Sequence, residues 1–354
     1  MNQNFYRNFI AGVNDNFGGR LLRFLLRLVS AAYRVAVGLR NFCYDKHLLR
    51  TYGVDAAVIS VGNITTGGTG KTPLVIWLCR VLEKRSLKCA VLTRGYKVEG
   101  AKFADEPVIL AKSCSGAKVI ANADRAQAAR KAVAEFGANV LVMDDGFQHR
   151  RLRRDLDIVA VDATCPFGYG RLLPAGMLRE PAKALRRADA VVITRYDQAT
   201  SEQVEELENQ IEQIAPDAAV AKAVHKHPCA KAIKGRTLSI DELKEKVIFA
   251  FCGVGNPDAY LNRLAEFGLN VVGSKVYSDH HDYNHEDILD IYEQARSWGA
   301  NLILSTEKDW VKSSLLAPRD DDIIFAYLAV ELEFVDGVDK IEALIDEVIG
   351  RSNG

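Results

Sequence analysis

Residues 58–78 read VISVGNITTGGTGKTPLVIWL, which is an apolar segment, a glycine cluster and a second apolar segment. We interpret the stretch as a strand, a turn and a helix that begins at Lys71. In this arrangement main-chain N–H groups and a helix N-terminus hold phosphate oxygens. The strict pattern G-x-x-x-x-G-K-[ST] would need a glycine at Thr65, so the stretch fits the compressed form G-G-x-G-K-T. It predicts a nucleotide site, and a glycine-rich helix cap without a ligand is the alternative.

The residues of this turn have distinct predicted roles. We expect the Lys71 ammonium to reach the terminal phosphates and the Thr72 hydroxyl to bind Mg²⁺. ATP and Mg²⁺ are therefore the predicted cofactors. The predicted nucleotide-binding residues are Gly67, Gly68, Thr69, Gly70, Lys71 and Thr72.

A second apolar segment, NVLVMDDGF at residues 139–147, ends in a pair of acids. As a strand it would deliver Asp144 and Asp145 to the sheet edge where open α/β proteins bind their ligands. A strand that ends in Asp is common, but a pair of acids that follows a phosphate loop favours a nucleotide–Mg²⁺ site. The strand ending in ITRYD, residues 193–197, lacks the asparagine and lysine of a guanine-reading motif. That difference favours ATP over GTP.

Beyond residue 55, apolar runs alternate with helical stretches, which predicts a mainly parallel sheet flanked by helices. The pattern weakens between residues 191 and 247, and a second, smaller α/β unit follows. The fold class is therefore α/β, resembling P-loop NTPases, with an N-terminal amphipathic helix. The predicted domains are residues 1–50, 51–228 and 229–354. The predicted strands of the first sheet are Ala57 to Val61, Cys89 to Thr93, Val119 to Ala121, Val140 to Met143, Ile158 to Val161 and Val191 to Thr194.

The segment RLLRFLLRLVSAAYRVAVGLR, residues 20–40, is basic and has no acid. Insertion across a bilayer would gain about 0.3 to 0.6 kcal/mol per apolar residue but cost about 2.5 to 3.5 for each central arginine. Because Arg23, Arg27 and Arg34 would all lie inside, we expect the segment not to span. As a helix it gathers its arginines opposite Leu22, Leu25, Leu26 and Val29, which is typical of a helix lying in an anionic membrane surface. A helix packed on its own domain and a cleaved presequence are the alternatives.

The bulk composition excludes some classes of function. The formal net charge is +0, so no overall field favours nucleic acid, and nothing indicates an obligate protein partner. The seven cysteines form no C-x-x-C pair, which argues against a zinc or redox motif and favours reduced cytosolic thiols.

Acid-base candidates come from three short polar segments: His149 in DDGFQHRR, Asp105 in ADEP, and His280 with His281 in SDHHDYNHED. The spacing H-H-x-x-x-H at residues 280–285 suggests a metal site, but adjacent histidines in a short loop seldom form a zinc centre. A lone histidine is more often structural than catalytic, so the residues alone leave these roles open.

The quoted motifs, together with TRGYK, LLPAGMLREP, FCGVGNPDAY and STEKDWVK, occur in the order typical of one family. The chain resembles the tetraacyldisaccharide 4'-kinases from about residue 20 to residue 330. DDGFQH and LPAG-x-LREP are not general phosphate-loop features, so the resemblance is specific. It implies ATP-dependent phosphorylation of the 4'-hydroxyl of an acylated glucosamine disaccharide 1-phosphate. It also implies a peripheral or monotopic location on the cytoplasmic side of the inner membrane, with an anionic membrane surface as partner.

The resemblance also implies residue roles. Asp105 and His280 would form a dyad that activates the acceptor hydroxyl, with His281 as the alternative histidine. Arg179 and Glu180 would face the phosphate and Mg²⁺. The head group of the lipid would meet residues from three segments of the chain, namely Arg125, Gln148, His149 and Arg179.

Two other classes of protein carry the same glycine turn. A partitioning or maturation switch NTPase places a lysine at the start of the turn, where this chain has Thr65 and Thr66. A membrane adaptor with a vestigial nucleotide fold would tolerate loss of Lys71, Thr72 or Asp144, and all three are present.

Overall fold

The computed structural model describes residues 6, 9, 10, 12, 17–95, 105–279, 281–318 and 322–352. Within these the chain forms two compact units. The larger unit comprises residues 9–96, 110–225 and 332–354. Residues 226–331 form the body of the smaller unit, to which residues 105–109 are also assigned.

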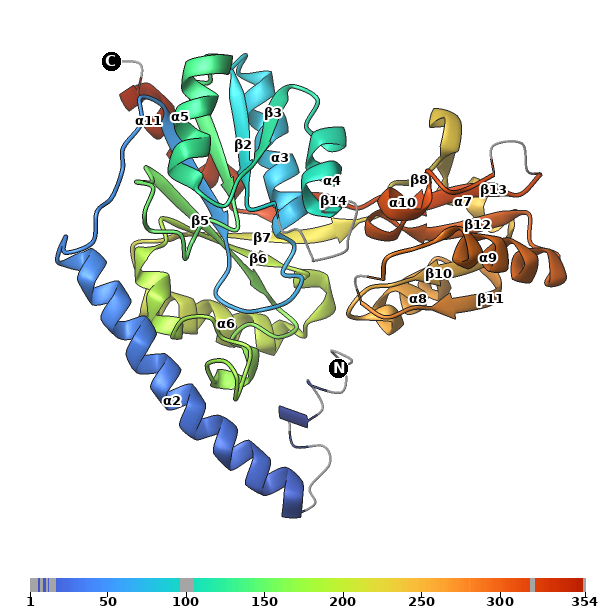
Figure 1. Ribbon diagram of the computed structural model, residues 1–354, viewed down its shortest axis with the longest axis horizontal. Helices are drawn as coiled ribbons and strands as arrows, with labels where there is room; N and C mark the ends of the chain where they lie inside the picture. Colours follow the sequence, from blue (N-terminus) through green and yellow to red (C-terminus); the bar gives the residue numbers. More distant parts are fainter. Residues whose placement is uncertain are drawn as a thin grey trace. The chain divides into compact units, whose positions relative to one another are not determined.

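The larger unit is built on an eight-stranded sheet in the order β14-β7-β6-β5-β1-β4-β2-β3 (Figure 1). Its pairings from β7 through β3 are all parallel. The central strands are buried along their whole length, as expected of a parallel sheet covered on both faces. The strands are β1 (Ala57–Gly62), β2 (Cys89–Thr93), β3 (Ala117–Ala121), β4 (Val140–Asp144), β5 (Leu156–Asp162), β6 (Ala190–Thr194), β7 (Ala219–Lys226) and β14 (Glu331–Asp336).

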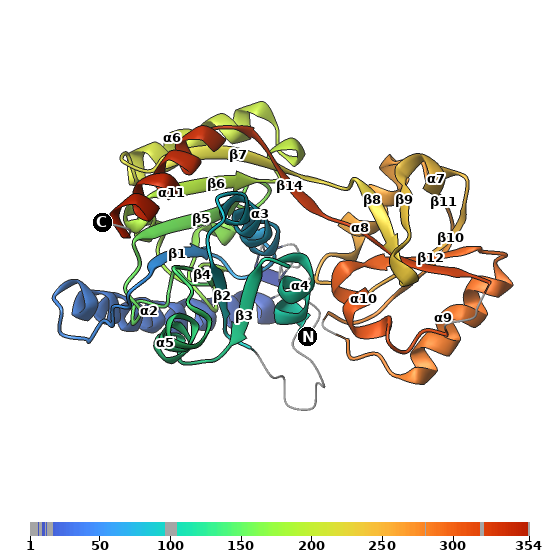
Figure 2. The same cartoon turned by 90° about the horizontal axis from the view of Figure 1, so that it is seen from above.

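Helices cover the two faces of this sheet. The crossover from β1 to β2 runs in the opposite direction to the one from β3 to β4, so right-handed connections put α3 (Lys71–Lys84) and α5 (Arg125–Phe136) on opposite faces (Figure 2). The C-terminal helix α11 (Val338–Ser352) lies beside α3, where Arg85 forms ion pairs with Glu342 and Asp346. Two further helices, α4 (Asp105–Ser113) and α6 (Ser201–Ile214), complete the connections.

The longest helix is α2 (Phe17–Asp45), drawn in blue in Figure 1. Only Ser30 and Val37 are fully buried along it, and most of its apolar side chains are exposed. The predicted basic helix over residues 20–40 is therefore present and longer than expected. In the described part of the chain, no helix has both the length and the apolar character needed to cross a membrane.

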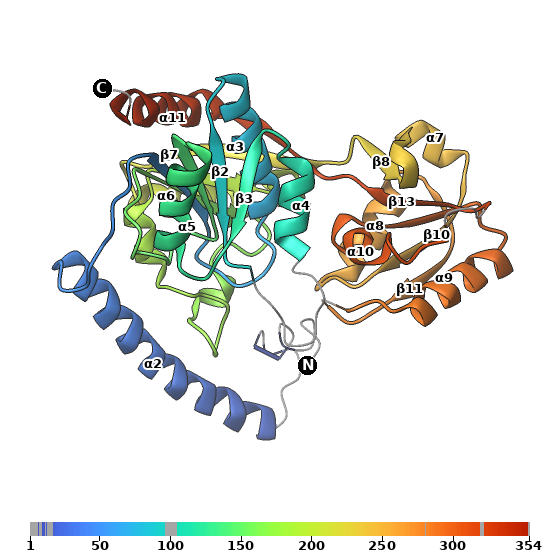
Figure 3. The same ribbon diagram turned by 45° about the horizontal axis from the view of Figure 1, so that its top comes forward.

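The smaller unit contains a six-stranded sheet in the order β11-β10-β12-β13-β8-β9, with helices packed on its faces (Figure 3). Its strands are β8 (Cys229–Ala232), β9 (Thr237–Ser239), β10 (Val247–Cys252), β11 (Asn270–Val276), β12 (Leu302–Thr306) and β13 (Ile324–Leu328). The neighbouring strands β11, β10, β12 and β13 pair in parallel, while β8 pairs antiparallel with β13 and β9. Its helices are α7 (Ile240–Lys244), α8 (Pro257–Glu266), α9 (His285–Ser297) and α10 (Glu307–Ser313).

The predicted fold class is confirmed: two α/β units, a mainly parallel main sheet and an N-terminal helix are all present. The two units do not follow the three predicted ranges, because residues 17–50 are grouped with the larger unit and residues 105–109 with the smaller one. The chain leaves the larger unit at residue 226, close to the predicted boundary at 228, but residues 332–354 return to it. The return occurs because β14 lies next to β7 in the main sheet and α11 packs against β1 and β5.

Candidate functional site

The phosphate turn lies between β1 and α3 and depends on glycine at two positions. Gly67 has φ 113° and Gly70 has φ 82°, both in the left-handed region that side chains disfavour. Gly70 is also the residue before the first turn of α3. A Cβ at Gly70 would lie 2.6 Å from Nε2 of His225, so a larger residue would need both a strained φ and a shift of that imidazole. Helix α3 begins at Lys71, as predicted, so its first main-chain N–H groups directly follow the glycine turn.

Two buried side chains that the sequence did not single out hold this turn in place. The amide Nδ2 of Asn63 donates to Oγ1 of Thr69 at 2.9 Å, and the Thr194 hydroxyl donates to the Thr69 carbonyl at 2.9 Å. Asn63 follows β1 and Thr194 ends β6, so two strands fix one residue of the turn. The only sequence signal for them was their position immediately after or at the end of an apolar strand.

An ion cluster lies beside the turn. The Lys71 ammonium is 3.5 Å from Oδ1 of Asp145, and the Arg179 guanidinium contacts both carboxylate oxygens of Asp145 at 2.8 and 2.9 Å. Burial alone would raise the pKa of Asp145, but the charges of Lys71 and Arg179 outweigh burial and hold that pKa below its usual range. Asp145 also has φ 52°, a strained backbone conformation for a residue other than glycine. Such strain is concentrated at functional sites, where surrounding contacts maintain it.

Asp144 is the last residue of β4 and is paired in register with Val61 of β1. It is 3% exposed, and one of its carboxylate oxygens lies 3.5 Å from the Thr93 hydroxyl. Within the described residues, no three His, Cys, Asp or Glu side chains come together as a metal-binding group. The carboxylates of Asp144 and Asp145 fit Mg²⁺, which is usually held by one or two carboxylates together with substrate phosphates and water.

A buried cation lies behind Asp144. Arg125 is 3% exposed and donates to the main-chain carbonyls of Asn122 and Asp144 at 2.7 and 3.3 Å. Burial lowers the pKa of Arg125 to about 10, while the charges of Asp144 and Asp145 act in the opposite direction. The guanidinium therefore stays charged at neutral pH.

His149 and Gln148 lie on the loop that follows Asp145. Burial, and then the charge of Arg125, lower the pKa of His149, so its imidazole is neutral at pH 7. Nε of Arg125, Nδ1 of His149 and Oε1 of Gln148 are buried and have no hydrogen-bond partner among the described residues. Unpaired buried polar atoms commonly mark a place where a ligand or water is bound.

Glu180 is in a different environment from the other predicted metal ligands. It is 1% exposed, and its Oε2 accepts from the Arg187 guanidinium at 2.8 Å and from the Asn41 amide at 3.1 Å. The Arg187 guanidinium also lies 4.5 Å from the centre of the Phe147 ring. Its Oε1 is buried and has no hydrogen-bond partner among the described residues, so one carboxylate oxygen is left for a ligand or water.

The predicted dyad falls largely outside the described residues. Asp105 is the first residue of α4, and its side chain is not described; His280 lies outside the described residues altogether. His281 is described, and its Nε2 lies 3.0 Å from Oδ2 of Asp287 while its ring stacks on Tyr277. Its imidazole therefore contacts Asp287 and Tyr277, and the choice between His280 and His281 as the dyad histidine stays a prediction.

Known proteins are similar to this chain along most of its length. The model of the tetraacyldisaccharide-1-P 4'-kinase family matches residues 22–350. A tetraacyldisaccharide 4'-kinase from Syntrophus aciditrophicus is 39% identical over 87% of this chain and 88% of its own length. A protein of the same name from Halothermothrix orenii is 34% identical over 92% of each chain. The crystal structure of LpxK from Aquifex aeolicus in complex with ATP superposes with a TM-score of 0.75 at 29% identity, covering 93% of this chain and 99% of that one.

Proposed function

The chain belongs to the tetraacyldisaccharide 4'-kinase family, and from this premise we propose how its own residues carry out the reaction. The protein is a phosphotransferase with an alcohol acceptor that uses ATP to phosphorylate the lipid A disaccharide precursor. The alternative function, a switch NTPase, belongs to a different family from the kinase family whose model matches this chain. The observation that most supports our assignment of the phosphate-binding residues is the ion cluster of Lys71, Asp145 and Arg179 beside the glycine turn.

The turn and its cluster act on the phosphates of ATP. The main-chain N–H groups of residues 67–72 bind the β- and γ-phosphate oxygens, and Lys71 neutralises charge on them. Thr72, Asp144 and Asp145 would hold Mg²⁺, which neutralises the phosphates when bound. Glu180 is the fourth predicted ligand: its Oε2 pairs with Arg187, and its unpartnered Oε1 would be the atom that faces the ion.

The acceptor side of the reaction needs a base. The 4'-hydroxyl oxygen attacks the γ-phosphorus, the bond from that phosphorus to the bridging oxygen of ADP breaks, and the hydroxyl proton passes to the Asp105 carboxylate. His280 orients that carboxylate. This assignment follows from the family motif, because the structure leaves both side chains undescribed.

The buried cation at Arg125, together with Gln148 and His149, is suited to an anionic group of the acceptor. A guanidinium pairs with a phosphate through two parallel hydrogen bonds, and the unpartnered Nε of Arg125 is one donor available for this. Because the pKa of His149 is lowered, its neutral ring can accept or donate a hydrogen bond without adding charge. We propose that this group binds the 1-phosphate of the disaccharide.

The test is phosphate transfer from labelled ATP to a tetraacyl disaccharide with and without its 1-phosphate, in detergent micelles. We expect Arg125→Lys to raise KM for the 1-phosphate acceptor by about tenfold, since one bidentate contact is lost. KM for the acceptor that lacks the phosphate should be unchanged. Equal effects on both acceptors would contradict the assignment of Arg125, whereas no transfer by the unaltered protein would contradict the function itself.

Helix α2 is suited to a lipid surface. Its exposed apolar side chains have exposed fractions from 48% to 85%, and an apolar face of this extent on a monomer usually marks an interface. The arginines Arg20, Arg27 and Arg34 are exposed on the same helix. We infer that α2 lies in the anionic cytoplasmic surface of the inner membrane, where the acyl chains of the substrate reside. The exposed residues are Phe17, Leu21, Leu22, Phe24, Leu25, Leu28, Val29, Val35, Leu39 and Phe42.

We expect the double substitution of Arg27 and Arg34 by Gln to weaken binding to vesicles that contain anionic lipid. Each basic residue near such a surface contributes about 1 kcal/mol, so the loss should be roughly tenfold to thirtyfold in low salt. Vesicle sedimentation measures it, and Arg351→Gln, at an arginine with 72% exposure in α11, serves as the control. An unchanged vesicle affinity would assign α2 to packing alone.

A further inference from the structure

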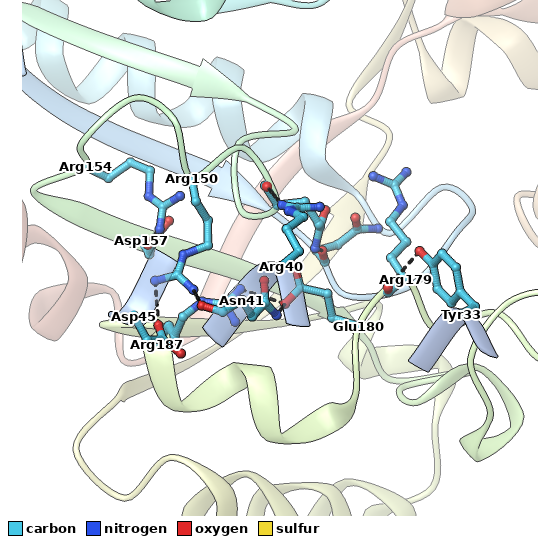
Figure 4. Close-up of polar contacts among 12 residues, drawn as sticks. Tyr33, Arg40, Asn41, Asp45, Arg150, Arg154, Asp157, Arg179, Glu180 and Arg187 are labelled. Atoms are coloured by element: carbon cyan, nitrogen blue, oxygen red, sulfur yellow. Dashed lines mark hydrogen bonds and ion pairs between the residues drawn. The ribbon is translucent and has the colours of Figure 1, made fainter. Parts of the chain in front are cut away.

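Helix α2 forms hydrogen bonds with the segment that carries Arg179 and Glu180. The Ser30 hydroxyl donates to the Leu172 carbonyl at 2.9 Å, and the Tyr33 hydroxyl donates to the Arg179 carbonyl at 3.0 Å. The Asn41 amide donates to the Glu180 carboxylate at 3.1 Å. Figure 4 shows Tyr33 and Asn41 pointing from α2 toward Arg179 and Glu180. The inner side of α2 therefore contacts the segment that reaches the phosphate site.

The segment is also held from the opposite direction. The Arg179 N–H donates to the Ile64 carbonyl at 2.8 Å, which ties its main chain to the start of the glycine turn. Its guanidinium pairs with Asp145, and Asp145 contacts Lys71. The Glu180 carboxylate is fixed by Arg187. The position of Arg179 thus depends on contacts from α2 and from the turn together.

A second route joins α2 to the same turn. The Arg40 guanidinium donates to the Gln148 carbonyl, and the Gln148 amide donates to the Asn63 carbonyl at 2.8 Å. Asn63 in turn holds the Thr69 side chain. Both routes consist of consecutive hydrogen bonds and end on residues of the phosphate turn or its ion cluster.

We propose that Tyr33 and Asn41 are positioning residues for phosphate transfer, which set Arg179 against Asp145 from within a helix that otherwise faces lipid. The inference rests on the proposed roles of Arg179, Asp145 and Lys71. Glu180 is nearly fully buried, so its carboxylate depends on its few partners, and losing one of them shifts the segment. Helix α2 is therefore part of the phosphate site and not only an attachment to the membrane.

The substitutions that test this are Tyr33→Phe, which removes one hydroxyl, and Asn41→Leu, which keeps the size of the side chain. Tyr44→Phe is the matched control, because Tyr44 lies on the same helix and its ring contacts Arg150 instead of residues 179–180. Full-length protein is assayed for kcat, for Mg²⁺·ATP affinity by calorimetry, and for binding to vesicles of anionic lipid. Asn41→Gln, which restores an amide donor, is the conservative variant.

We expect Tyr33→Phe and Asn41→Leu each to lower kcat or ATP affinity about fivefold, which corresponds to the loss of one ordinary hydrogen bond. Vesicle binding should stay near that of Tyr44→Phe, and Asn41→Gln should recover part of the loss. Values of kcat and ATP affinity equal to those of Tyr44→Phe would overturn the proposal. So would a parallel loss of vesicle binding, because it would place these residues in contact with lipid. Calorimetry needs no acceptor, so it tests the inference even if the acceptor assignment fails.

Discussion

Lys71→Ala should lower kcat/KM for phosphate transfer by on the order of 10³-fold, the effect of removing a preorganised charge from a transition state. Lys71 begins α3 next to Gly70, and its ammonium lies 3.5 Å from Asp145 in a site where little solvent screens it. Arg179 cannot take over this role, because it is already paired with the same carboxylate. The measurement is steady-state transfer from labelled ATP to the tetraacyl disaccharide 1-phosphate.

The control for this substitution is Lys84→Ala, at an exposed lysine in the last turn of the same helix. It changes the net charge by the same amount and should leave transfer within about twofold, as most surface substitutions do. Circular dichroism and thermal unfolding of both variants separate a loss of fold from a loss of chemistry. Full activity of Lys71→Ala with normal ATP binding would remove this residue from the mechanism.

The strands of the main sheet could be predicted from sequence because each is a short apolar run. The predicted strand from Cys89 to Thr93 has the bounds of β2, and the strand predicted from Ala57 ends one residue short of β1. Strands buried on both faces need no alternation of polar residues, so an apolar run bounded by loop residues identifies them. The sequence predicted that the sheet is mainly parallel, but it did not predict the order of the strands.

The return of residues 332–354 to the larger unit could not be predicted in the same way. β14 is adjacent to β7 in the sheet although more than a hundred residues separate them in the chain. No local pattern records the partner of a strand, and the alternation of helices and strands continues through both units. A boundary placed where the sequence pattern weakens therefore carries no information on where the chain returns to the larger unit.

In the candidate site too, residues that belong to a local motif could be predicted, whereas partners that are distant in sequence could not. Lys71, Asp144 and Asp145 could be predicted as site residues because phosphate binding needs those residue types after a strand. The structure brings Lys71 and Asp145 into contact. The partners of Glu180 were not identifiable, since Asn41 is 139 residues away in sequence and an asparagine on a helix has many uses. Buried networks of this kind depend on tertiary packing, which no short motif encodes.

Asp105→Asn should lower kcat by about 10³-fold, within the range for loss of a general base. The amide keeps the size and most hydrogen-bonding capacity of the carboxylate but cannot accept the proton of the 4'-hydroxyl. Because ATP is bound by the glycine turn, its affinity should change less than twofold. The measurement is single-turnover transfer with enzyme in excess, which reports the chemical step separately from product release.

The control is Glu106→Gln, which neutralises the next acid in the same segment. It removes the same charge one residue along α4, so a general electrostatic effect of acids near ATP would appear in both variants, whereas proton transfer would be lost only in Asp105→Asn. The pH profile adds an independent readout: if Asp105 takes the proton, the acidic limb of kcat for the unaltered enzyme disappears in Asp105→Asn and remains in Glu106→Gln. Equal rates for the two variants would show that the proton leaves by another group, and the same pair of assays on His280→Gln would then test whether the histidine acts as the base.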